Sequence, residues 1–184
     1  MSTTTYISLL RGINLGSHNR IKMESLRTSL SALGFEQVRT YIQSGNAVFC
    51  CADRSTSKLS EKIERQILND FNLTVPVISL TAEEMHRTIR KNPFLQQAGI
   101  DISRLHVSFL SDNPVRSAIK KLDALAAGLD QFCCSAKVVY LHCPGGYGET
   151  RLSNGALEKL LSVRATTRNW KTVNNLYQMA TELD

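Results

Sequence analysis

The order of the predicted strands and helices is the feature that most constrains the fold of this chain. Short apolar runs typical of strands alternate with segments whose apolar residues recur at helical spacing. The order strand, helix, strand, strand, helix begins near residue 6 and begins again near residue 105. We therefore predict an α+β fold with two duplicated ferredoxin-like (βαββα) halves and antiparallel sheets.

The first half of this pattern contains recognisable start, stop and turn signals. Gly34 stops the first helix, and Thr81 with Glu84 three residues later forms a capping box that opens a short helix. Ser44-Gly45-Asn46 is a compact turn between two strands, which makes that pair a hairpin. The predicted elements are a strand at 6–10, a helix at 23–33, strands at 37–43 and 47–51, a helix at 59–71, a strand at 75–80 and a short helix from 81.

The second half repeats this order with its own signals. Asn113-Pro114 places a proline at the first position of a helix, Ser153 caps another, and Asn169 caps the last. The strands are predicted at 105–110, 131–135 and 138–143, and a glycine-rich loop follows at 144–148. We predict an N-terminal half at 1–91 and a C-terminal half at 103–184, joined by the link 91–102.

Composition limits the class of protein. Hydrophobic residues make up 42 % of the 184 residues, which is enough for a packed core. The N-terminus has no signal-peptide pattern and no apolar run is long enough to span a bilayer, so we expect a cytoplasmic protein with no membrane partner. The five cysteines include two adjacent pairs and no CxxC spacing, so we expect reduced thiols, no metal and no cofactor.

The excess positive charge lies in two stretches rich in asparagine, glycine and threonine. The formal net charge is +6; residues 1–50 carry five basic and two acidic residues, and residues 151–172 carry five basic and one acidic. A basic surface rich in hydrogen-bonding groups is a candidate anion site.

The first stretch contains the loop 12–22, which joins a strand to a helix. It matches neither a Walker A loop nor GxGxxG, because its glycines stand four residues apart and no Gly-Lys-Ser/Thr follows. Its asparagines either bind a ligand or satisfy the turns of the loop itself. The candidate ligand-binding residues here are Arg11, Asn14 and Lys22, with Ser44 and Asn46 from the hairpin turn.

The second stretch places cations around the start of the last helix. Arg168 and Lys171 flank Asn169, and free backbone amides at a helix start favour an anion. Arg151 beside the cap Ser153 is a second arrangement of this type. Trp170 either stacks on a base or anchors the core.

Among the histidines, only His18 lies in a polar loop, so it is the one candidate for a general acid or base. We interpret His106 and His142 in strand patterns, and His86 on a helix, as structural or surface residues.

Three motifs together resemble a known family. They are Leu-Leu-Arg-Gly-Ile-Asn-Leu-Gly-Ser-His-Asn-Arg-Ile-Lys-Met at 9–23, Arg-Thr-Tyr-Ile-Gln-Ser-Gly-Asn at 39–46 and Thr-Thr-Arg-Asn-Trp-Lys-Thr-Val at 166–173. The chain resembles domain-of-unknown-function family 1697 (DUF1697) over nearly its whole length. The resemblance implies two ferredoxin-like halves and no established activity, substrate or cofactor; a glycine is more common in that family where Ser17 stands.

These observations favour a protein that binds a phosphorylated or polyanionic ligand, either a phosphate-containing small molecule or a nucleic acid. The alternatives are an enzyme acting on a phosphorylated or nucleotide-like substrate, with His18 in proton transfer, and a non-catalytic interaction module. We predict that loop 12–22, the turn 44–46 and residues 168–172 form one basic pocket.

Overall fold

Two compact units make up the chain, and each contains one antiparallel sheet. The computed structural model describes residues 3–16, 18–126 and 128–183. Unit 1 comprises Met1–His86 and Asn175–Asp184, and unit 2 comprises Arg87–Asn174. Helices α3 (Ala82–Arg90) and α6 (Trp170–Thr181) therefore each contain residues of both units.

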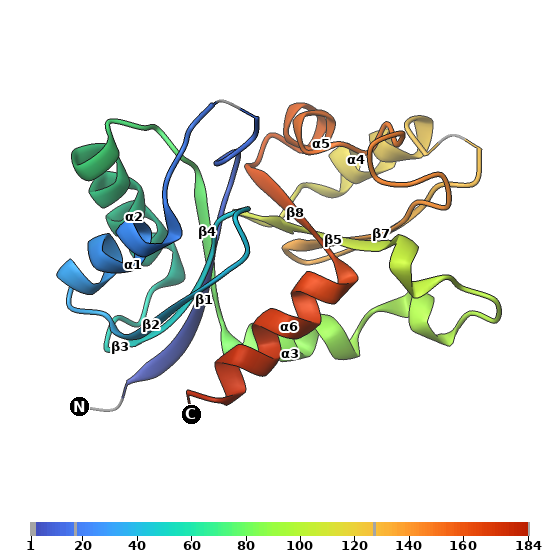
Figure 1. Cartoon of the computed structure of the whole chain (residues 1–184). Coiled ribbons are helices and arrows are strands. Elements are labelled where there is room, and N and C mark those ends of the chain that lie inside the picture. Colours follow the sequence, from blue (N-terminus) through green and yellow to red (C-terminus); the bar gives the residue numbers. More distant parts are fainter. Residues whose placement is uncertain (1–2, 17, 127, 184) are drawn as a thin grey trace. The chain divides into compact units, whose positions relative to one another are not determined.

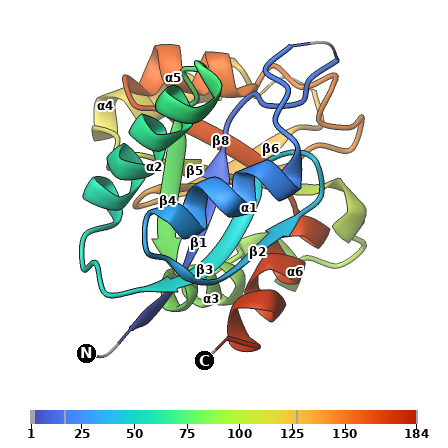
Figure 2. The same cartoon turned by 60° about the vertical axis from the view of Figure 1, so that its left-hand side comes forward.

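The sheet of unit 1 has its first strand in the interior. Its order is β2 (Glu36–Tyr41), β3 (Asn46–Cys51), β1 (Thr4–Leu10) and β4 (Val77–Thr81). Helices α1 (Met23–Ala32) and α2 (Thr56–Phe71) cover one face of this sheet (Figures 1 and 2). Alternate residues of the strands meet the apolar sides of both helices because side chains alternate between the faces of a strand. The largest of these buried residues include Tyr6, Leu10, Leu26, Phe49 and Ile63.

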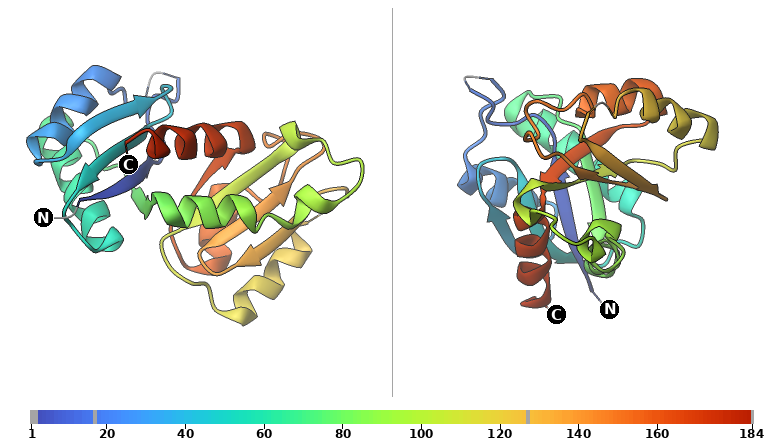
Figure 3. Two further views of the ribbon diagram at one scale, coloured as in Figure 1. Left: turned by 90° about the horizontal axis from the view of Figure 1, so that it is seen from below. Right: turned by 90° about the vertical axis from the view of Figure 1, so that its right-hand side faces the viewer.

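The sheet of unit 2 has the equivalent order. It runs β6 (Gln131–Ser135), β7 (Val138–His142), β5 (Leu105–Leu110) and β8 (Ala165–Asn169). Helix α5 (Asn154–Leu161) and helix α4 (Arg116–Ile119), which continues as the 3-10 turn η3 (Lys120–Ala124), cover one face (Figure 3). Two further 3-10 turns, η1 (Pro93–Gln96) and η2 (Ile102–Arg104), precede β5.

The same tertiary hydrogen bonds recur in both units. The backbone N–H of Leu10 donates to the carbonyl of Gly45, and that of Leu110 donates to the carbonyl of Lys137, both at 2.8 Å. A glutamate on the second helix of each unit accepts from the first residue of the last strand: Glu64 from Val77 at 2.8 Å, and Glu158 from Ala165 at 2.9 Å. These contacts align the units residue by residue and confirm the duplicated α+β architecture.

One strand was missing from the predicted pattern. Residues 165–169, where the sequence analysis placed no strand, form the edge strand β8. Polar composition concealed it, but Thr166 and Thr167 are β-branched residues that favour strands. Both predicted hairpins are confirmed. Helix α6 begins one residue after Asn169, whose Oδ1 accepts from the backbone N–H of Thr172 at 2.8 Å.

Candidate ligand-binding surface

The loop 12–22 of unit 1 folds into a small hairpin of its own. The backbone N–H of Asn14 donates to the carbonyl of Asn19 at 3.0 Å, and that of His18 donates to Leu15 at 3.1 Å. Asn14 and Asn19 both adopt positive φ angles, of 55° and 49°. Asparagine tolerates this left-handed region better than most residues. Ser17 lies outside the described residues.

The side chain of Asn14 holds this hairpin against the rest of unit 1. Its Nδ2 donates to the carbonyls of Ile21 at 3.0 Å and Gln43 at 2.8 Å, while its Oδ1 accepts from the backbone N–H of Ile21 at 2.9 Å. Asn19 adds one hydrogen bond, from its Nδ2 to the carbonyl of Gly12 at 3.1 Å. These amides therefore act within the protein and connect the loop to the turn after β2.

The turn 42–45 between β2 and β3 is also held by its own side chains. Asn46 is fully buried, and its Nδ2 donates to the carbonyl of Tyr41 at 3.0 Å and to Oγ of Ser44 at 3.1 Å. Gly45 packs directly against the start of loop 12–22, since an added Cβ would lie 2.7 Å from the Ile13 side chain. Ser44 and Asn46 thus stabilise the turn.

The cations of the loop remain on the surface. Arg20 and Lys22 are exposed, and neither side chain forms a hydrogen bond or ion pair in the described part of the chain. His18 is exposed as well, whereas Arg11 is partly buried and has a polar or electrostatic contact. The loop therefore presents positive charge from a backbone held by internal hydrogen bonds, an arrangement suited to binding an anion.

Arg168 of unit 2 is an interior residue. Only 9 % of it is exposed, and its guanidinium donates to Oγ1 of Thr166 and to the carbonyl of Thr167, both at 2.9 Å. Burial lowers the pKa of the Arg168 guanidinium to about 10, so it stays charged at neutral pH. Trp170, at the start of α6, is likewise buried, which favours the core role over a stacking platform.

The remaining candidates of unit 2 lie at its surface. Lys171 and Arg151 are exposed, and Asn169 uses its side-chain oxygen to cap α6. Loop 12–22 and turn 44–46 thus lie together in unit 1, while Arg151 and residues 168–172 belong to unit 2. The single basic pocket stays a prediction.

Sequence reasoning missed a polar cluster in unit 2. Thr167 on β8 is its centre: it bonds to Ser108 on β5 at 2.6 Å, accepts from the Tyr147 hydroxyl at 3.0 Å and donates to Oδ1 of Asn154 at 2.7 Å. The ring of His106 stacks on Tyr147 with 5.0 Å between ring centroids. The glycine-rich loop at 144–148 was the signal that could have pointed here.

The cysteines form no disulfide with one another in the structure, which describes all five. Burial raises the pKa values of the Cys51 and Cys143 thiols, which occupy equivalent positions in the two units, at the last residue of β3 and directly after β7. Among the described residues, no three His, Cys, Asp or Glu side chains gather as a metal site would require.

Comparison with known proteins places the chain in a family. The family model for DUF1697, a protein family of unknown function, matches residues 3–140. The chain belongs to this family. Its fold also resembles the solved structure of a conserved bacterial protein, SP0830, from Streptococcus pneumoniae, with a TM-score of 0.77 and 25 % sequence identity over 97 % of this chain and 99 % of that one.

No curated protein matches this DUF1697 chain. Within the described residues, none of its helices combines the length and the apolar character needed to cross a membrane.

Proposed function

We propose that this DUF1697 protein binds a phosphorylated or polyanionic ligand, a nucleotide or nucleic acid, through the exposed cations of loop 12–22. One observation carries the proposal: Asn14 closes the loop on Ile21 by two hydrogen bonds and ties it to Gln43 by a third, while Arg20 and Lys22 remain exposed. A binding loop that is already ordered loses less conformational entropy when its ligand arrives.

The charge of the loop supports an anionic partner. Between residues 11 and 22 there are three basic residues and no acidic one. Like charges held on one short loop repel each other, and an anion relieves that repulsion. Lys171, Arg151 and the amides at the start of α6 provide further positive character in unit 2.

We also propose that the protein works in a reducing compartment such as the cytoplasm. Its five cysteines, none of which forms a disulfide with another, are consistent with such a compartment.

A thermal-shift screen against inorganic tripolyphosphate, nucleotides, and short RNA and DNA tests the proposal. A ligand that binds the folded state raises the melting temperature by mass action. If the increase in melting temperature falls steeply with added salt, the ligand is a polynucleotide. If the increase persists in salt, the ligand is a small phosphate compound. If none of these ligands raises the melting temperature at low salt, the proposal is wrong.

An interaction module is the second candidate, and two exposed apolar side chains favour it. Leu15 in the loop is 65 % exposed and Ile42 in the adjoining turn is 50 % exposed. Ile42 also has a φ of +49°, which is strained for a β-branched residue, and such strain concentrates at functional sites. The module would be favoured by a binding partner whose affinity does not change with salt but is lost in the variants Leu15→Ser and Ile42→Ser. The enzyme alternative receives no comparable support, since no described residue forms a hydrogen bond, ion pair or ring contact with the His18 side chain.

A further inference from the structure

The start of β5 in unit 2 differs from its counterpart in unit 1. The shared strand register places His106 where unit 1 has Tyr6. Tyr6 is buried and its hydroxyl donates to the carbonyl of Asp53, whereas His106 is partly exposed. Unit 1 therefore has a buried aromatic ring at this position, whereas unit 2 has a partly exposed imidazole.

The loop that covers this position also differs. In unit 1 residues 52–55 connect β3 to α2, whereas in unit 2 residues 143–153 connect β7 to α5. Asn154, the first residue of α5, aligns with Ser60 in the interior of α2, so the longer loop replaces the first turn of that helix. The loop carries Tyr147. Long loops on a rigid frame often serve function.

Hydrogen bonds fix the position of Tyr147. Thr167 has one hydroxyl proton, which it donates to Asn154, so Ser108 and Tyr147 must both donate to Thr167. With its hydroxyl fixed, Tyr147 lies against the His106 ring at an interplanar angle of 26°. The cluster thereby holds the imidazole in one orientation.

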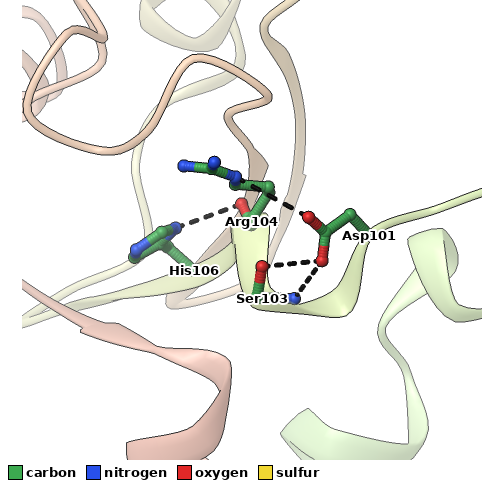
Figure 4. A network of polar contacts seen from close by, with 4 residues as sticks. All are labelled: Asp101, Ser103, Arg104 and His106. Atoms are coloured by element: carbon green, nitrogen blue, oxygen red, sulfur yellow. Dashed lines mark hydrogen bonds and ion pairs between the residues drawn. The ribbon is translucent and has the colours of Figure 1, made fainter.

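The tautomer of the His106 ring follows from the hydrogen bond between its Nδ1 and a backbone carbonyl. Its Nδ1 lies 3.2 Å from the carbonyl oxygen of Arg104, which can only accept, so Nδ1 carries the proton (Figure 4). In the neutral ring Nε2 then has a lone pair. Burial lowers the pKa of His106, and the charge of Arg104 lowers it further against the opposing effect of this hydrogen bond.

Arg104 supplies a cation beside this acceptor. Its Nε pairs with Asp101 at 3.7 Å, and Asp101 is itself bound by the backbone N–H of Ser103 at 2.9 Å and by its hydroxyl at 2.6 Å. In Figure 4 the terminal nitrogens of Arg104 and the His106 ring extend to the same side, away from Asp101. Arg104 also approaches the long loop, because its Nη1 lies 3.4 Å from where a Cβ on Gly146 would stand.

We propose that His106, Arg104 and loop 143–153 form a binding site for a terminal phosphate monoester. The ligand must offer an anionic oxygen to Arg104 and an O–H donor to Nε2 of His106. A phosphate monoester has both near neutral pH because its second pKa is about 6. A phosphodiester has no P–OH and lacks the donor. This site lies within unit 2 and does not depend on loop 12–22.

NMR of the histidine rings tests this site. Titrating the whole protein in inorganic phosphate, and in sodium chloride of equal ionic strength, follows His106 with His18, His86 and His142 as internal references. We expect phosphate to move the His106 midpoint up by about 1 pH unit, the scale of a nearby opposite charge, because the shared proton passes from P–OH to Nε2 and the resulting phosphate dianion stabilises the charged imidazole. A nucleoside 5′-monophosphate should act likewise, whereas dimethyl phosphate should leave the midpoint unchanged.

Variants of exposed arginines separate this effect from screening. Arg104→Gln should abolish the phosphate-dependent change, while Arg116→Gln, which removes an exposed charge from α4, should keep it. The site is disproved if the His106 midpoint is the same in phosphate as in sodium chloride, or if phosphate shifts the midpoints of all four histidines equally. An equal response in Arg104→Gln and Arg116→Gln also overturns it.

Discussion

Asn14 donates a hydrogen bond from Nδ2 to the carbonyl oxygen of Gln43 at 2.8 Å, across 29 residues of sequence. This contact joins the basic loop to the turn between β2 and β3, and two further bonds from the same amide close the loop on Ile21. Asn14 therefore supplies three of the four side-chain hydrogen bonds described above that hold the loop in the conformation presenting Arg20 and Lys22.

Replacing Asn14 should destabilise unit 1 more than replacing Asn19. Both residues have positive φ angles, so alanine introduces similar backbone strain at each. Beyond that shared strain, Asn14→Ala loses three side-chain hydrogen bonds and should lower the free energy of unfolding by about 2–4 kcal/mol; Asn19→Ala loses one and should cost about 1 kcal/mol. Urea denaturation measures both, and equal losses would show that Asn14 does not hold the loop.

Gly45 provides a test of the packing between turn and loop. In Gly45→Ala the new Cβ would lie 2.7–2.8 Å from atoms of Ile13 and Leu10, in addition to the strain of a φ of +79°. The control is Gly34→Ala, where φ is +81° and no atom lies within 4 Å. We expect a loss of about 1–2 kcal/mol for Gly34→Ala, from the backbone alone, and about 1–3 kcal/mol more for Gly45→Ala. Similar melting temperatures for the two variants would contradict the close packing.

Tyr140 should make the protein less stable in alkaline solution. It is 2 % exposed, its hydroxyl donates to the carbonyl of Thr88 at 3.0 Å, and burial together with Cys133 raises its pKa to about 12. The unfolded chain loses this proton near pH 10, so the stabilisation is complete below pH 10 and is lost as the pH rises toward 12.

Urea denaturation between pH 8 and 11.5 measures this effect. We expect stability to fall by up to about 1.4 kcal/mol per pH unit from Tyr140 above pH 10. Burial also raises the pKa of Tyr6, which adds to the slope in the same direction. Tyr140→Phe should have a shallower slope than the natural protein; an unchanged slope would mean that Tyr140 titrates as it does in the unfolded chain.

The buried Arg168 has a leucine counterpart, because the strand registers align it with Leu80 of β4. Arg168→Ala leaves a cavity and removes the packing of the side-chain stem, so it should cost about 2–4 kcal/mol. Arg168→Leu fills the position with the residue that unit 1 uses there and should be the milder change. A leucine variant less stable than the alanine variant would show that the guanidinium contacts dominate.

Local signals predicted most of the fold. Helical periodicity, the capping box at Thr81 and Glu84, and the compact turn at 44–46 each depend on residues close in sequence, and the structure has all three. Strand β8 was missed because its polar side chains suggested a loop, and one hydrogen-bond partner of Thr167, Ser108 on β5, is 59 residues away in the sequence.

The candidate site was harder to predict from the sequence, because the contacts that decide it also join residues far apart in the chain. Asn14, Ser44 and Asn46 were chosen as hydrogen-bonding residues for a ligand, but each forms hydrogen bonds within unit 1 itself. Arg168 was chosen for its charge, and its burial depends on tertiary packing. His106 was set aside because a strand pattern shows neither the long loop folded over it nor Tyr147.

Binding of a labelled single-stranded oligonucleotide and of tripolyphosphate to two charge-matched double variants tests the central claim most directly. Arg20→Gln/Lys22→Gln removes the exposed cations of the loop, and Arg54→Gln/Lys58→Gln removes two exposed cations at and just before the start of α2. We expect the first variant to bind at least tenfold more weakly than the natural protein, since one lost charge-assisted contact costs about 1.5–3 kcal/mol. The second variant should bind within about twofold of the natural protein, allowing for the change in net charge. Equal affinity of both variants for these ligands would contradict binding through loop 12–22.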